Sequence, residues 1–240
     1  MASAEVFGRP DWRFPGSSVR RLRRLLVTNA LPAVFFGFFC GVKTLFVMHA
    51  LVGAARPAGG SSQAFAVLNL LDQVLGLVYF GLIALLCATR LPRLTGRRDV
   101  GTVATALFAA FAIMLIGVLP DRAVQPWAQA VGDVLLAIGM AYSLFALLYL
   151  RRSFSILPEA RRLVTAGPYA VTRHPLYLGE GVAALGLLVT SAGPTAGVVA
   201  LAALSAQLLR MRWEEAVLTR EFPEYEAYAR RVARFIPFIA

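Results

Sequence analysis

The sequence has little charge for its length. Only 15% of its 240 residues are Asp, Glu, Lys or Arg, whereas 58% are hydrophobic, and the mean hydropathy is +0.68. A soluble domain of this size keeps more charge on its surface, and long apolar stretches with few charges belong in lipid. The composition therefore indicates an integral membrane protein, and the length suits one compact unit.

Cysteine and histidine are also scarce. Cys40 and Cys87 both lie inside apolar runs, so we interpret them as buried apolar side chains rather than a disulfide or a metal site. His49 and His174 are the two histidines of the chain, which argues against a metal centre built from several histidines. We expect no metal. Residues 1–24 lack the apolar core of a cleavable signal peptide, and none is expected.

Acidic residues number 13 against 24 basic ones, which gives a net charge of +11. Nucleic-acid binding is one interpretation of such an excess. The arginines, however, lie at the ends of apolar segments, where membrane orientation explains them better. We expect no nucleic-acid partner.

Six apolar segments are candidates for membrane-spanning helices, each of which needs about 20 residues. They run approximately over 30–54, 65–88, 100–119, 124–150, 176–190 and 195–211. A tight turn at 191–194 joins the last two segments into a predicted hairpin of two short helices. The predicted fold is therefore all-α and polytopic, with a scaffold in 1–150 and the recognisable chemistry in 151–240.

The connections between these segments alternate in charge. The second and fourth connections are arginine-rich, as is the chain before the first segment, whereas the first holds only Arg56 and the third holds Asp121 and Arg122, which cancel. By the positive-inside rule both termini face the cytoplasm. The arginines that set this pattern are Arg20, Arg21, Arg23, Arg24, Arg90, Arg93, Arg97, Arg98, Arg151, Arg152, Arg161, Arg162 and Arg173.

Three charged side chains fall inside predicted spans: Lys43, Asp72 and Asp133. A charge isolated in lipid is costly, so such groups face the bundle interior and find partners. We predict an ion pair between Lys43 and Asp72, which Asp133 could extend. Asn69, Asp72 and Gln73 share one helical face by their spacing. These groups either clasp helices together or form the polar end of a substrate cavity.

The connection before the fifth segment contains a candidate anion site. Gly167-Pro168 marks a turn, and Pro175 suits the first position of a helix. Free N–H groups at that helix start, flanked by Arg173 and His174, could hold a carboxylate or a phosphate. Glu180, one turn further, suggests a pocket for a zwitterion. The alternative is a headgroup-anchored loop with interfacial tyrosines.

Two adjacent carboxylates, Glu214 and Glu215, lie where the last segment is predicted to leave the membrane. The C-terminal end of a helix disfavours negative charge, so these groups need nearby cations. Arg173, Arg210 or an amine of a ligand could serve. From Tyr225 onward, arginine, aromatic and glutamate residues alternate as in an amphipathic helix that lies along the membrane surface.

These motifs, in this order and spacing, resemble the isoprenylcysteine carboxyl methyltransferase family, and the loop at 153–161 resembles its bacterial branch. The resemblance covers roughly 154–238. It implies a multi-pass protein of the bacterial inner membrane, an S-adenosylmethionine pocket and a tunnel for a lipophilic acceptor. The cofactor-binding residues it implies are Gly167, Tyr169, His174, Pro175, Tyr177, Leu178, Gly179, Glu214 and Glu215. The catalytic candidates are Arg173, Glu180, Arg210 and Glu215.

The acceptor stays open at this stage. A carboxylate needs only a cation such as Arg152, Arg173 or Arg210 to hold it, whereas an amine or a thiol needs deprotonation, with which Glu180 or Glu215 could assist. Two other functions remain. Sterol-type reductases have similar motifs but use NADPH, although paired carboxylates disfavour a polyphosphate. A non-catalytic scaffold or transporter subunit would also carry charges within its spans.

Overall fold

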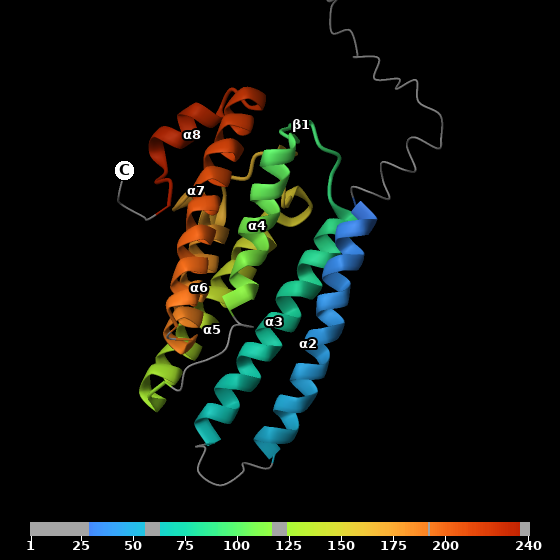
Figure 1. The fold of residues 1–240 in the computed structure, drawn as a ribbon. Coiled ribbons are helices and arrows are strands. Elements are labelled where there is room, and N and C mark those ends of the chain that lie inside the picture. Colours follow the sequence, from blue (N-terminus) through green and yellow to red (C-terminus); the bar gives the residue numbers. More distant parts are fainter. Residues whose placement is uncertain (1–28, 56–62, 117–123, 192, 236–240) are drawn as a thin grey trace, which may run out of the picture.

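The computed structural model describes residues 29–55, 63–116, 124–191 and 193–235. Within them, six apolar helices lie side by side with their axes in roughly the same direction (Figure 1). The all-α membrane fold predicted from the sequence is confirmed. The helices are α2 (Leu31–Ala55), α3 (Gln63–Thr89), α4 (Val100–Ile116), α5 (Pro126–Leu150), α6 (Pro175–Ser191) and α7 (Pro194–Glu221).

Four of these helices are long and apolar enough to cross a membrane, namely α2, α3, α5 and α7. The other two, α4 and α6, have 17 residues each, so the predicted count of six spans is not established. The basic cluster Arg20–Arg24, Arg56, the pair Asp121 and Arg122, and most of the aromatic tail at 235–238 lie outside the described residues.

Helix α7 differs from its prediction. It has 28 residues and ends at Glu221, so the expectation of a short last helix ending near Met211 was wrong. The charged residues beyond Met211 are good helix formers in water, and the helix stops only at Phe222, which precedes Pro223 and is extended, with φ −120° and ψ 105°. Glu214 and Glu215 therefore lie within a helix and not at its end.

Helices α6 and α7 follow each other in the chain but pack mainly on other partners. Helix α6 packs most extensively against α5, and α7 against α4, while α2 and α3 form a third pair. Glycines explain the first pairing, because a Cβ at Gly139 would lie 2.6 Å from the carbonyl oxygen of Gly179. One at Gly186 would lie 2.5 Å from the carbonyl oxygen of Gly132. Small residues allow membrane helices to approach this closely.

The buried core contains aromatic and aliphatic side chains of α2, α3 and α5, together with the segment that leads into α6. The charged side chains within the helices have other partners than those predicted from the sequence. Lys43 Nζ donates to Gln73 Oε1 at 2.8 Å and forms no ion pair with Asp72, because the lysine crosses over Gly76 and reaches the amide first. Asp133 accepts a hydrogen bond from Gln129 at 2.9 Å, so it does not extend such a pair either.

The loops at one end of the bundle, which we call the arginine-rich end, are joined to each other. Strand β1 (Thr95–Gly96) pairs antiparallel with β2 (Glu159–Ala160). Glu159 accepts hydrogen bonds from Arg98, from Arg161 at 2.7 Å and from Ser155 at 3.0 Å. Burial alone would raise the pKa of the Glu159 carboxyl, but these donors and the two guanidinium charges outweigh it, so that the pKa is lowered.

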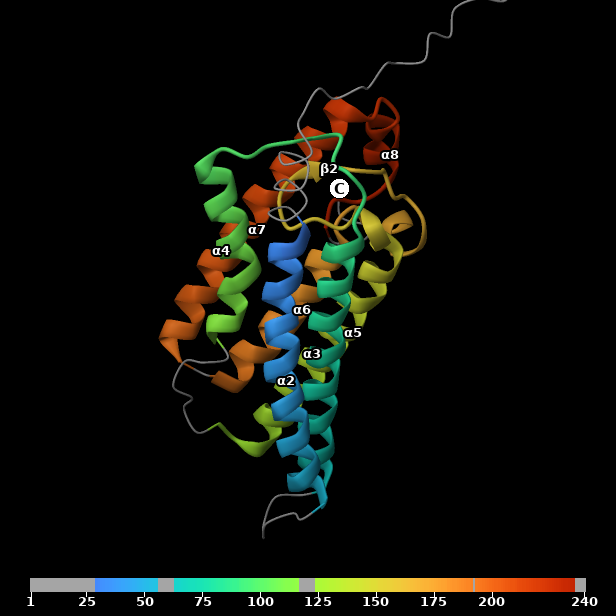
Figure 2. The same ribbon diagram turned by 90° about the vertical axis from the view of Figure 1, so that its right-hand side faces the viewer.

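The predicted C-terminal helix is present as α8 (Tyr225–Arg231), which folds back beside the end of α7 (Figure 2). It is amphipathic, since Tyr225 and Tyr228 are buried while Arg230 and Glu226 are exposed. The chain after α8 returns to the turn that precedes α6, where Arg173 donates its backbone N–H to the carbonyl of Ala233 at 2.8 Å. This return places the tail against the start of α6.

Candidate functional site

Three segments meet at one carboxylate at the arginine-rich end. Oε1 of Glu215, on α7, lies 3.0 Å from Nη1 of Arg173 and 3.1 Å from Nε2 of His174. The guanidinium of Arg234, from the tail, donates to Oε2 of the same carboxylate at 3.0 Å. The structure thus brings together the turn before α6 and the C-terminal part of α7, as the sequence predicted. Three basic side chains surround a single negative charge.

An aromatic ring joins this cluster to the second carboxylate. The His174 ring stacks on Tyr177 with centroids 5.4 Å apart and planes 14° from parallel, and the Tyr177 hydroxyl donates to Glu214 Oε1. The guanidinium of Arg210 lies 4.9 Å from the centre of the Tyr177 ring, and its Nε is 3.3 Å from Glu214 Oε1. A cation over a ring face is a favourable contact when water is excluded.

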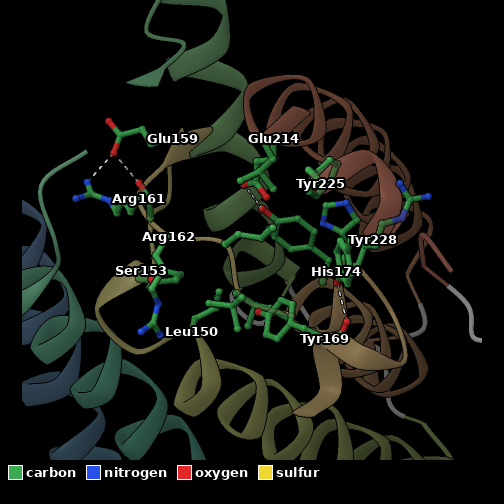
Figure 3. Close-up of a pocket in the computed structure, with 18 of the residues that line it drawn as sticks. Leu150, Ser153, Glu159, Arg161, Arg162, Tyr169, His174, Glu214, Tyr225 and Tyr228 are labelled. Atoms are coloured by element: carbon green, nitrogen blue, oxygen red, sulfur yellow. Dashed lines mark hydrogen bonds and ion pairs between the residues drawn. The ribbon is translucent and has the colours of Figure 1, made fainter. Parts of the chain in front are cut away.

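Of these groups, Arg173, His174, Tyr177 and Glu214 line a cavity of about 100 Å³, which we call the outer cavity (Figure 3). Glu159 and Arg161 lie on one side of it, and His174 and Tyr228 on the other. The Tyr228 hydroxyl donates to the backbone carbonyl of Tyr169 at 2.6 Å. Burial raises the pKa of Tyr228 to about 12, so its hydroxyl stays a neutral donor. The remaining lining includes Leu150, Ser153, Phe154, Ser155, Leu157, Arg162, Leu163, Val164, Leu176, Leu218 and Tyr225.

Some residues predicted to bind the cofactor lie away from the outer cavity. Gly167 begins the short helix η3 (Gly167–Ala170) with φ +62°, where a side chain would be strained and would collide with the ring of Tyr149. Pro175 is buried at the first position of α6, and Gly179 lies in the interface with α5. None of these three, nor Leu178, lines the outer cavity.

A second, larger cavity of about 450 Å³, which we call the inner cavity, lies among the helices. Its wall is mostly aromatic and aliphatic, with side chains such as Phe36, Phe39, Phe80, Phe111, Met114 and Met140. Glu180 faces this cavity and not the outer one. Its carboxylate accepts hydrogen bonds from the Tyr79 hydroxyl at 2.8 Å and from Gln207 Nε2 at 2.6 Å.

Two side chains connect the linings of the two cavities. Phe154 lines both of them. Arg210 lines the inner cavity, yet it reaches Glu214 and Tyr177 of the outer one. Its Nη2 also donates to the backbone carbonyl of Ser155 at 3.3 Å. The arginine therefore forms part of the wall between a polar site and an apolar one.

Sequence reasoning missed several of these contacts. Arg234 stands in the run Arg230-Arg231-Val232-Ala233-Arg234, where nothing distinguishes it from the other surface arginines. Tyr79 and Gln207 are polar residues within apolar spans, and that position is a signal that could have drawn attention to them.

The fold and site define a class: a polytopic helical membrane protein with a charged pocket at one end of its bundle and an apolar cavity directly behind it. Residues 127–225, from α5 to the start of α8, match the family model of phospholipid methyltransferases. This match confirms the resemblance to the isoprenylcysteine carboxyl methyltransferase-like enzymes. The similarity covers less than half of the chain, from residue 127 to residue 225.

Two curated relatives are similar over shorter stretches. The chain is 40% identical over 80 residues to the nickel-cobalt-cadmium resistance protein NccN of Alcaligenes xylosoxydans xylosoxydans. These 80 residues are 33% of this chain and 38% of the relative. It is 43% identical over 77 residues to the cobalt-zinc-cadmium resistance protein CzcN of Cupriavidus metallidurans. These 77 residues are 31% of this chain and 35% of the relative. The chain thus spans little more than a third of either relative. The described residues contain no cluster of His, Cys, Asp or Glu suited to a metal ion.

Proposed function

We propose that the protein transfers a methyl group from S-adenosylmethionine to a lipophilic acceptor at the cytoplasmic face of a membrane. One observation carries the proposal: the charged cluster around Glu215 borders a pocket that shares Phe154 with an apolar cavity between the helices, and Arg210 reaches from that cavity to Glu214. A polar cofactor and an apolar substrate could approach each other there from opposite sides. The cytoplasmic assignment follows from the arginines at this end.

The charges around the outer cavity suit a zwitterionic ligand. Arg173 and Arg234 together carry two positive charges against the single charge of Glu215, so the cluster retains attraction for a carboxylate. Both protein contacts of Glu214 are made by Oε1, which leaves Oε2 for an ammonium. Ser153 Oγ and Arg173 Nε line this cavity, are buried, and have no hydrogen-bond partner among the described residues. Such orphaned groups fit a polar ligand.

Bound there, S-adenosylmethionine supplies an electrophilic methyl group on a positively charged sulfur. The protein's part is to align the acceptor with that carbon and to exclude water. We assign the alignment of a carboxylate acceptor to Arg210, whose charge lies at the boundary of the two cavities. A carboxylate has no proton to lose, so that one C–O bond forms as one C–S bond breaks and no base is required.

The two candidate bases differ in their surroundings. Glu215 is held by three basic groups, so we assign it the positioning of Arg173 and Arg234. Glu180 faces the cavity of the acceptor and accepts from two neutral donors. It is the carboxylate placed to take a proton if the acceptor is an amine or a thiol.

The test uses the full chain purified in detergent. Calorimetric titration with S-adenosylmethionine should show saturable binding that NADPH does not displace, and labelled cofactor should deliver its methyl group to a component of a lipid extract. Arg210→Met should abolish transfer while binding of the cofactor persists. Binding of NADPH in place of the methyl donor would replace this proposal with a reductase.

A further inference from the structure

The inner cavity is not closed by hydrocarbon at its deep end. Asp72, Gln73 and Lys43 line it there, two helical turns along α3 from Tyr79. A plain prenyl or acyl chain would leave such groups without partners, which is costly in a membrane interior. The polar groups at the deep end therefore indicate that the molecule in the cavity has a polar group at that end as well.

One atom among them lacks a partner. The side chain of Asp72 belongs to a residue that is only 6% exposed, and its Oδ1 has no hydrogen-bond partner within the described part of the chain. Its two polar neighbours bond elsewhere, since Lys43 donates to Gln73 at 2.8 Å and Gln73 donates to Asn69 at 3.2 Å. Buried acceptors in native proteins are nearly always satisfied, so Asp72 awaits a donor from outside the chain.

The nearer end of the same cavity also holds polar groups. Arg210 and Glu180 lie there, with Glu180 already bound by Tyr79 and Gln207. Tyr79 and Asp72 are seven residues apart on α3, which corresponds to about 10 Å along the helix axis. Between them the wall is apolar, with Phe36, Phe39 and Phe80 among its side chains. The cavity thus has two polar ends and an apolar middle.

We propose that the acceptor is a bifunctional lipophile, with its reacting polar group at Arg210 and a hydroxyl group at the other end of an apolar body of about 10 Å that donates a hydrogen bond to Asp72. A neutral hydroxyl suits this place better than an ammonium because Lys43, which interacts electrostatically with Asp72, would repel a second cation. This inference rests on the proposed function, because only methyl transfer makes the bound lipophile an acceptor. Binding of the lipophile in the cavity can nevertheless be tested without the reaction.

The experiment measures binding to the full chain in detergent, without cofactor, by calorimetry. The probes are decanoate and ω-hydroxydecanoate, which differ by one hydroxyl, and shorter and longer members of the same two series. Wild type should bind the ω-hydroxy acid about tenfold more tightly than the plain acid, with the preference greatest at one chain length. Equal affinity for both series at every length would overturn the proposal.

Variants tie the preference to one side chain. Asp72→Leu should erase it, partly by improving the binding of decanoate, whereas Asp72→Asn, which keeps an acceptor oxygen of the same reach, should retain part of it. Thr44→Val is the control, since Thr44 is also a polar residue within a helix but does not line the cavity and bonds to the backbone carbonyl of Cys40, and it should leave the preference intact. A preference that survives in Asp72→Leu places the hydroxyl elsewhere and contradicts the assignment.

Failure of the proposed function can be distinguished from failure of this inference. If the chain bound no S-adenosylmethionine and still preferred ω-hydroxy acids through Asp72, the cavity assignment would stand and methyl transfer would fall. If the cofactor bound and methyl transfer proceeded with no preference between the two acids, methyl transfer would stand and the bifunctional acceptor would fall.

Discussion

Nε2 of His174 lies 3.1 Å from Oε1 of Glu215, which is 41 residues further along the chain. Between them the chain descends through α6 and returns through α7, two helices that contact each other little. Helix α6 packs mainly on α5 and α7 mainly on α4, so the contact joins two helices whose main packing partners differ. The site depends on the packing of the whole bundle.

The first prediction concerns Glu215. Glu215→Gln removes the charge that holds Arg173 and Arg234 while it keeps the size of the side chain. The two guanidinium groups would repel each other and leave their present positions. A hydrogen bond to a charged group contributes about 1.5–3 kcal/mol, so affinity for S-adenosylmethionine should fall by at least tenfold, as measured by calorimetry.

Glu226→Gln is the control for that change. Glu226 pairs with Arg230 on the outer face of α8, where both side chains are largely exposed at 62% and 79%. Exposed pairs contribute little, and the affinity should stay within twofold of wild type. An equal loss in both variants would show that the effect is one of general charge and not of this cluster.

The second prediction separates the ring of Tyr177 from its hydroxyl. Tyr177→Phe keeps the stack on His174 and the contact with Arg210 but removes the donor to Glu214. We expect the KM for the cofactor to rise by about threefold to tenfold. Tyr177→Leu removes the ring as well and should raise it further. If both variants behaved alike, the hydroxyl would be the only part of Tyr177 that matters.

Much of this architecture could be predicted from the sequence. The length of each apolar run gave the helix ends to within a few residues for α2, α3 and α5, because the thickness of the bilayer sets that length. Pro175 marked the start of α6 for a local reason, since proline suits the first turn of a helix. The meeting of His174 with Glu215 followed from two spans that begin and end on one side.

Other features could not be predicted, and the reason is physical. Every face of a membrane helix is apolar, so hydrophobic periodicity does not show which helix packs on which. The pairing of α5 with α6 depends on Gly139 and Gly179 meeting at one level, which no single segment encodes. The same holds for Lys43. Its side chain packs over Gly76 and hydrogen-bonds to Gln73, a pairing that neither helix alone encodes.

The third prediction uses Glu159, which lies outside the helices. Its folded-state pKa is lowered, below the usual value of 4.5, so its pairing stabilises the fold fully above that value and is lost as the pH falls further. The thermal midpoint of wild type should therefore drop when the pH is lowered below 4.5, and Glu159→Gln should show a smaller drop in that window. The midpoint is read by circular dichroism in detergent.

At neutral pH the same variant should be less stable. Removal of one partner of a buried pair costs about 3–5 kcal/mol. Arg98 and Arg93 keep a third of their side-chain surface in contact with solvent, which puts the expected loss at the lower end of that range. Equal pH dependence of the two proteins would contradict the assignment of this charge to the stability of the loops.

The last prediction decides between two roles for Gly179. The sequence suggests a contact with the cofactor, whereas the structure places the glycine in the α5–α6 interface, where a Cβ would lie 2.8 Å from the carbonyl oxygen of Gly139. Gly179→Ala should therefore lower stability by about 1–3 kcal/mol through overpacking. Gly139→Ala, on the other side of the interface and away from either cavity, should do the same.

Gly37→Ala provides the matched control, because nothing lies within 4 Å of a Cβ at that position of α2. Alanine favours a helix more than glycine does, so this variant should be neutral or slightly more stable. If Gly179→Ala lost cofactor affinity at a temperature where it is fully folded, and Gly139→Ala did not, then Gly179 would have a part in the site itself. We expect the opposite result, because a shift in the α5–α6 interface would move His174 and Tyr177 equally in both variants.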